Sequence, residues 1–215
     1  MKDFLIGGII GLTQTLLGHP LDTIKVRIQN NQKWKNMKIT NYYKGCAYPI
    51  SGLLIYNIVV FPTYERSIKY TNSHLASGFC AGVAVSPFVY ITDIGKIKRQ
   101  SGLQLKIKDF VFTKGRVSNL ARESIANMCY FGGYFYCKHE LKLSPLISGG
   151  IAGLLNWTFT YPIDVIRTRQ MANNISIKKA INQGNLWKGY SACAMRAIIV
   201  NSASFYVYEK SKNLF

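Results

Sequence analysis

The same ionic pattern occurs three times in this 215-residue chain, at a constant interval. In each copy an aspartate is followed three residues later by one cation and five residues later by a second. The three copies are Asp22/Lys25/Arg27, Asp93/Lys96/Lys98 and Asp164/Arg167/Arg169, and successive aspartates lie 71 residues apart. A period longer than that of solenoid repeats, kept over three copies, indicates three equivalent structural units. We expect one domain spanning residues 1–215, made of repeats 1–71, 72–142 and 143–215.

Uncharged stretches of helical length separate the ionic patterns. No charged side chain occurs in residues 46–64, 75–92 or 143–163, and the one titratable side chain in residues 4–21 is His19. Each is close to the ~20 residues that a helix needs to cross the hydrocarbon of a bilayer. Two weaker segments, 124–137 and 197–208, complete a set of six. Because a bilayer forces the backbone to satisfy its own hydrogen bonds, these segments predict an all-α protein of six transmembrane helices. Six buried helices of a soluble protein remain the alternative.

The positive charge falls on one side of this predicted topology. The net charge is +18, and the basic residues concentrate between spans one and two, three and four, and five and six. Such loops mark the side that is not translocated, which places both termini on the opposite side. This distribution argues against nucleic acid as a partner, and no zinc ligands or base-stacking aromatic motif support one.

Within each copy the aspartate and the first cation share a helix face, because they are three residues apart. Three aspartates and three cations at one depth are able to pair between helices and close a ring. Snorkelling of interfacial Lys and Arg would explain the cations, but it leaves the three aspartates in phase without a reason.

The repeated pattern resembles the mitochondrial carrier family. It is carried by Pro20 to Arg27, by the stretch from Gly149 to Arg169, and by a basic-glycine pair after each aspartate (Lys44-Gly45, Lys114-Gly115 and Lys188-Gly189). Repeat two departs from the pattern, with Ile91 where proline is expected. The resemblance implies a transporter of the mitochondrial inner membrane, with six tilted helices around a central cavity, short matrix helices in the basic loops, and alternating access. It also implies a lipid bilayer with cardiolipin as a candidate lipid, monomeric function and no cofactor or metal.

The same resemblance implies two gates. The matrix gate would pair Asp22 with Lys96, Asp93 with Arg167, and Asp164 with Lys25. Gln29 and Gln100 would brace it, whereas Met171 takes the third brace position and cannot hydrogen-bond in that way. The outer gate is incomplete: its residues are Glu65, Lys138, Glu209 and Lys212. Only Glu65 and Lys138 are able to pair between helices, which predicts an outward gate that opens easily.

The resemblance places substrate contacts at Gly52 and Leu53, at Arg122 and Glu123, and at Arg196. Five residues beyond the first position of each set lie three asparagines, Asn57, Asn127 and Asn201. Ionised groups at mid-membrane depth cost several kcal/mol, so the two arginines and Glu123 should face water or one another. A packing pair of Arg122 with Glu123 is the alternative, weakened because adjacent helical residues do not face each other. For the asparagines the alternative is hydrogen bonding between helices.

Two arginines and one glutamate suit a zwitterion, and the Arg-Glu pair resembles amino-acid, carnitine and S-adenosylmethionine carriers. We therefore expect transport of an amino acid or a carnitine-like solute, with a nucleotide or deoxynucleotide exchanger as the alternative. The many Asn, Lys, Ile and Tyr residues suggest an AT-rich genome, and a parasite or virus would place the protein in a host mitochondrion. A non-transporting membrane protein stays open. An enzyme is disfavoured, because the three histidines have no partnered nucleophile and no phosphate-binding glycine loop is present.

Overall fold

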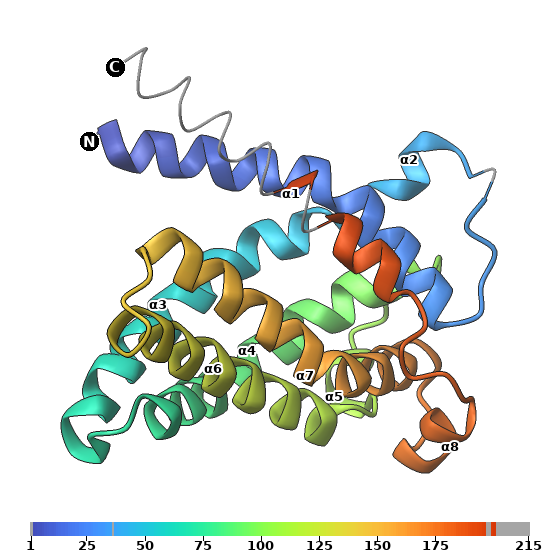
Figure 1. The fold of residues 1–215 in the computed structure, drawn as a ribbon. Coiled ribbons are helices and arrows are strands. Elements are labelled where there is room, and N and C mark those ends of the chain that lie inside the picture. Colours follow the sequence, from blue (N-terminus) through green and yellow to red (C-terminus); the bar gives the residue numbers. More distant parts are fainter. Residues whose placement is uncertain (1, 36, 197–198, 201–215) are drawn as a thin grey trace.

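The computed structural model describes the backbone of residues 2–35, 37–196 and 199–200 (Figure 1). These residues form helices joined by turns and loops, without a strand, as an all-α fold requires. Five helices are long: α1 (Lys2–Gln29), α3 (Ala47–Thr71), α4 (His74–Gln100), α6 (Arg116–His139) and α7 (Pro145–Asn173). Three are short: α2 (Ile39–Tyr42), α5 (Asp109–Phe112) and α8 (Ile177–Asn182). Helical backbone also covers residues 190–196.

Each of the first five expected spans coincides with one long helix, although the spans 46–64 and 143–163 begin one and two residues before α3 and α7. A short helix lies in each basic loop. Two segments of the described chain, Ile39–Thr71 and His74–Gln100, are long and apolar enough to cross a membrane. Of the expected sixth span, only residues 199 and 200 are described. The six-span topology and the three repeats therefore remain predictions.

Small polar residues mark where the long helices begin and end. Ser73 and Ser144 are the N-caps of α4 and α7, and each hydroxyl accepts a hydrogen bond from the backbone N–H three residues later. Asn72 and Asn174 end α3 and α7 in the left-handed conformation, with φ of 48° and 52°. Asparagine tolerates this conformation better than other residues with a Cβ, so it stops a helix without a glycine.

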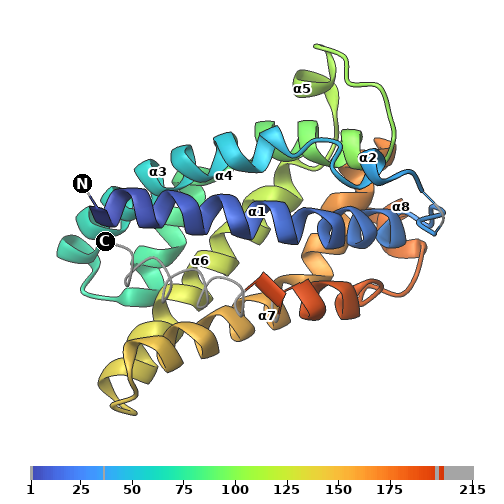
Figure 2. The same cartoon turned by 90° about the horizontal axis from the view of Figure 1, so that it is seen from above.

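The long helices form a curved wall with α1 lying across its open side. Helix α4 packs extensively against α3 and α6, and α6 packs against α7, whereas α1 makes smaller contacts with α3, α4 and α7. Figures 1 and 2 show α1 running beside α3 and α4 on one flank and α7 on the other. This arrangement leaves the ends of α1, α4 and α7 directed at a shared space.

Two glycines bring α4 against α6. A Cβ at Gly82 would lie 2.3 Å from the carbonyl oxygen of Glu123, and one at Gly78 would lie 2.5 Å from that of Asn127. The contact continues at Asn119, whose side-chain nitrogen donates to the carbonyl and hydroxyl oxygens of Ser86 at 2.8 and 2.9 Å. By contrast, Gly149 and Gly153, the equivalent glycines of repeat three, meet no described atom within 4 Å.

Buried or paired cations hold the loops against the helix ends. The guanidinium of Arg169 is fully buried and donates to four backbone carbonyls, those of Gln29, Ala180, Gly184 and Asn185. It therefore joins α7, the last turn of α1 and α8. At the end of α4, Lys98 forms an ion pair of 2.8 Å with Asp109 of α5. The hydrogen bond from Lys98 holds the pKa of the Asp109 carboxyl below its ordinary value.

We expect Gly82→Ala to destabilise the protein, because its Cβ overlaps a main-chain oxygen and α6 would have to move. Overpacking of this kind typically costs about 1–3 kcal/mol. Gly150→Ala is the matched control, since nothing lies within 4 Å of its Cβ and alanine favours a helix by about 0.5–1 kcal/mol. Thermal unfolding in detergent, followed by labelling of the buried thiols of Cys137 and Cys193, checks both. Equal midpoints for the two variants would show that the α4–α6 contact is not this tight.

Candidate functional site

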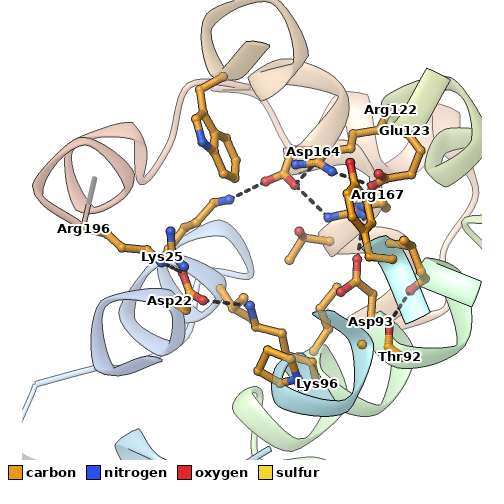
Figure 3. A pocket seen from close by; sticks show the side chains of 18 residues that line it. Asp22, Lys25, Thr92, Asp93, Lys96, Arg122, Glu123, Asp164, Arg167 and Arg196 are labelled. Carbon is orange, nitrogen blue, oxygen red and sulfur yellow. Dashed lines mark hydrogen bonds and ion pairs between the residues drawn. The ribbon is translucent and has the colours of Figure 1, made fainter. Parts of the chain in front are cut away.

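A pocket of about 340 Å³ lies where α1, α3, α4, α6, α7 and the helical segment 190–196 converge. Figure 3 shows its charged side chains directed at one another across a shared space. The charged lining residues are Asp22, Lys25, Asp93, Lys96, Arg122, Glu123, Asp164, Arg167 and Arg196. The pocket thus collects the three ionic patterns together with the charged residues expected at the substrate positions.

Three ion pairs connect α1, α4 and α7 in a closed ring. Lys96 of α4 meets Asp22 of α1 at 2.7 Å. Arg167 of α7 meets Asp93 of α4, also at 2.7 Å. Lys25 of α1 meets Asp164 of α7 at the same distance. These are the three pairs that the resemblance implies, each between different repeats.

Asp164 has more partners than either of the other two carboxylates of the ring. Besides Lys25, its carboxylate lies 2.9 Å from Arg167 one turn along α7 and 3.9 Å from Nε of Arg122. The side-chain nitrogen of Gln29 donates to it at 3.3 Å, which fits the expected brace. Its side chain is only 2% exposed, compared with 19% for Asp93. Asp164 is therefore the most deeply buried carboxylate of the ring.

The second expected brace, Gln100, has other partners. Its side-chain nitrogen lies 3.3 Å from the hydroxyl of Thr23 and 3.5 Å from Nε2 of His19, both on α1. Gln100 thus contacts the helix that carries Asp22 without contacting the Asp22–Lys96 pair. Met171, at the third brace position, is fully buried in an apolar cluster of α1, α4 and α7.

Arg122 and Glu123 pair with each other, which is the alternative left open by the sequence, and the expectation from helix geometry against that pair does not hold. Nη1 of Arg122 lies 2.5 Å from Oε1 of Glu123. The Cα–Cβ bonds of adjacent helical residues point about 100° apart, but the long, flexible arginine side chain reaches across that angle. The Glu123 side chain is fully buried, and its Oε1 also lies 3.3 Å from Nη1 of Arg167. The glutamate at the expected substrate position therefore also contacts the ring.

Arg196, the other expected substrate arginine, also contacts the ring. Its Nε lies 2.7 Å from Oδ1 of Asp22, whose second oxygen pairs with Lys96. Gly52 lines the pocket beside Thr92 of α4, which its Cβ would meet at 3.3 Å. The side chain of Leu53 is not among the described ones.

The described asparagines do not form a ring. Asn57 is exposed, whereas Asn127 is buried and donates from its side chain to the carbonyl of Glu123 at 2.9 Å. The hydroxyl of Tyr56 donates to the Asn127 side-chain oxygen at 2.9 Å, so Tyr56, one residue before Asn57, makes the contact between α3 and α6. Asn201 lies outside the described residues.

The expected outer pair of Glu65 with Lys138 does not form. Both side chains are exposed, and Nζ of Lys138 lies 5.6 Å from the ring centre of Tyr134 instead. Because Tyr134 is one turn before Lys138 on α6, this contact stays within one helix. Glu209 and Lys212 lie outside the described residues.

Trp157 is a pocket residue that the sequence did not indicate to us. Nζ of Lys25 lies 4.5 Å and Cζ of Arg122 lies 5.4 Å from its ring. An aromatic face stabilises nearby cations by about 0.5–2 kcal/mol. Trp157 is seven residues, or two turns, before Asp164, so it shares that helix face. Searching two turns from each aspartate would have found it.

The charges of the pocket set limits on what it can bind. Five cationic and four anionic side chains line it, which leaves one excess positive charge. Each carboxylate has at least one partner at 2.7 Å or less. The arrangement suits a solute with one more negative than positive charge, or a zwitterion that exchanges its charges with existing pairs.

We expect Asp164→Asn to destabilise the protein far more than Asp93→Asn. Removing one partner from a buried ionic network typically costs about 3–5 kcal/mol, because the other charges stay buried without compensation. Asp93 is more exposed and has one ring partner, so water replaces part of its interaction. Thermal midpoints of the two variants in detergent test this order. A smaller loss for Asp164→Asn would show that it is not the principal carboxylate of the ring.

Comparisons with known proteins agree with these features. The family model described as "Mitochondrial carrier protein" matches residues 1–41 and 142–215, more than half of the chain. Mitochondrial substrate carrier family protein S of Dictyostelium discoideum is 28% identical over 276 residues, covering 97% of this chain and 95% of that protein. Mitochondrial ornithine transporter 1 of Saccharomyces cerevisiae is 24% identical over 272 residues, covering 96% and 93%. The mitochondrial carnitine carrier of the same yeast is 25% identical over 287 residues, covering 100% and 88%. The chain belongs to the mitochondrial carrier family, a family of transporters of the mitochondrial inner membrane.

Proposed function

We propose that this carrier moves a small zwitterionic metabolite, an amino acid or a carnitine-like solute, by alternating access. Six helices in the three repeats would surround the pathway as a monomer in the bilayer, with cardiolipin as a candidate bound lipid. The observation that carries the proposal is the pocket in which Arg122, Glu123 and Arg196 adjoin a closed ring of three ion pairs.

The solute class is supported by charge. With a single excess positive charge in its lining, the pocket balances a zwitterion or a monoanion better than a nucleotide with several negative charges. The names of two relatives fit a zwitterionic head group, since one is an ornithine transporter and the other a carnitine carrier.

We propose that the ring is the matrix gate and that the structure represents a carrier closed on that side. Glu65 and Lys138 do not pair with each other, and this supports the proposal because an open outer side requires their pair to be broken. To open the ring, a solute must bind the opened form more tightly than the closed one.

Shared residues supply a route for that difference in affinity. A solute carboxylate would compete with Asp22 for Arg196, which lies 2.7 Å from it. A solute ammonium group would compete with Arg167 for Glu123, which lies 3.3 Å from it. Each exchange weakens one member of the ring, so binding and gate opening use the same charges.

Reconstitution in liposomes tests the solute class. We expect saturable exchange of amino acids or carnitine and little exchange of nucleotides or deoxynucleotides, measured with radiolabelled solutes under matched loading. Nucleotide exchange without amino-acid or carnitine exchange would favour the alternative and overturn the zwitterion assignment.

We expect Arg196→Ala and Glu123→Gln each to reduce the initial exchange rate about 10- to 100-fold at limiting solute. A hydrogen bond to a charged group contributes about 1.5–3 kcal/mol, which corresponds to this range. Arg66→Ala is the matched control, because Arg66 is exposed on α3 and does not line the pocket. Full exchange by both site variants would instead support a structural role for these residues.

A further inference from the structure

A second chamber adjoins the charged pocket on the side away from the ring. It has a volume of about 270 Å³ and lies between α3, α6 and α7. Its lining on α3 and α6 begins at Tyr56 and Ala126, four residues beyond Gly52 and Arg122, and Asn156 of α7 is eight residues before Asp164. At 1.5 Å per helical residue, the lining begins about 6 Å beyond Gly52 and Arg122, and Asn156 lies about 12 Å from Asp164 along α7.

Tyr56 forms the boundary between the two cavities. It lines both of them, and its hydroxyl donates to the side-chain oxygen of Asn127 at 2.9 Å. The nitrogen of the same amide donates to the carbonyl of Glu123 at 2.9 Å. The boundary is therefore held in place from both α3 and α6, and a solute that lies beside Tyr56 reaches both spaces.

The chamber walls are aromatic and fixed before a solute arrives. Phe61 and Tyr130 are 50% and 38% exposed. Both pack edge-to-face on Phe131, with ring centres 6.2 and 5.7 Å away. Phe131 is buried and stacks on Tyr64 at 4.0 Å. An apolar group that enters covers exposed aromatic surface without ordering these side chains, which favours binding.

Two side-chain amides in the chamber have hydrogen-bonding atoms that no described residue pairs with. The side chain of Asn57 on α3 makes no hydrogen bond to the described residues. The side-chain oxygen of Asn156 on α7 accepts from Thr160 at 3.4 Å, while its nitrogen has no described acceptor. The described lining of the chamber contains no charged side chain. These groups match an uncharged solute group that carries its own hydrogen-bonding atoms.

We infer that the solute has an uncharged, hydrogen-bonding arm attached to its zwitterionic head, and that this arm occupies the chamber beside Asn57 and Asn156. This inference rests on the proposed function. The head exchanges charges with Arg196 and Glu123, and the arm extends past Tyr56. A charged arm would be desolvated beside aromatic rings without a counter-ion, which is costly. The chamber therefore selects against dibasic amino acids and for their neutral-arm counterparts.

Pairs of amino acids with the same head test this selection. Lysine is compared with Nε-acetyl-lysine and ornithine with citrulline, by initial exchange rates in liposomes at limiting solute. We expect the neutral-arm member to be preferred about tenfold, the equivalent of one to two net hydrogen bonds. The double variant Asn57→Ala/Asn156→Ala should reduce that ratio to near one. Ile58→Ala is the control, because Ile58 adjoins Asn57, is 71% exposed and does not line the chamber.

Three results would overturn the inference. The first is a preference for dibasic amino acids. Loss of that preference in the Glu65→Gln variant would show that their charged arm pairs with Glu65, which lines the next cavity on the outer side. The double variant could keep the wild-type ratio, which would remove the asparagines from recognition while amino-acid exchange, and so the proposed function, still stands. Failure of every amino acid and of carnitine to exchange would reject the proposed function together with this inference.

Discussion

The structure depends on the requirement that a buried carboxylate have a cation beside it. Asp164 is 2% exposed and Asp22 14% exposed, and each takes its partner at 2.7 Å from a different long helix. Burying such charges costs several kcal/mol per ion unless the geometry of the pair is good. These ion pairs therefore fix the separations between the ends of α1, α4 and α7. Helix α1 has only limited packing with α3, α4 and α7, and its position is fixed by Asp22 and Lys25 together with the hydrogen bonds of Arg27 and Arg169 at the helix ends.

In the proposed mechanism, solute recognition and gate closure use the same pocket because the ring residues also form ion pairs with residues outside the ring. Arg196 adds a second cation to Asp22, and Glu123 adds a second anion to Arg167. A ring of three ion pairs without further partners would offer no charged group that a solute exchanges with, so solute binding would not weaken it. Here each added residue offers an exchange, in which a solute group replaces a ring group on a partner that is already positioned. The excess positive charge follows from the same residues, since Arg122 and Arg196 outnumber Glu123.

The sequence predicted the features that depend on residue spacing, but it failed to predict the contacts that depend on how far a side chain reaches. A fixed interval between aspartates is sufficient to bring Asp22, Asp93 and Asp164 to one pocket, because equivalent positions in repeated helices lie at one depth. Helix geometry gave the direction of Arg122 correctly and its contact with Glu123 wrongly, because a long side chain is not confined to the direction of its Cβ. Equal spacing of Asn57 and Asn127 also did not give equal environments, because Asn127 is buried where Gly78 brings α6 close to α4, whereas Asn57 is exposed. Tyr56, not its neighbour, spans to α6.

The three copies of the ionic pattern have the same spacing, but the second cation of each copy does not always have the same kind of partner. Arg27 donates to the last carbonyl of α4, that of Gln100, and Arg169 donates to the last carbonyl of α1, that of Gln29. Each of these arginines holds the end of a helix from a neighbouring repeat. Lys98, at the equivalent place in repeat two, pairs with Asp109 of its own loop instead. A lysine presents its donors from a single nitrogen and has no planar fork, and here that nitrogen pairs with the Asp109 carboxylate. Lys98 makes no described hydrogen bond to α7. Repeat two holds the end of α7 by other contacts, which are the Arg167–Asp93 pair, the packing of Met171 with Ile97, and hydrogen bonds from the Lys114 backbone N–H to Asn174 and from the Ser118 hydroxyl to Gln170.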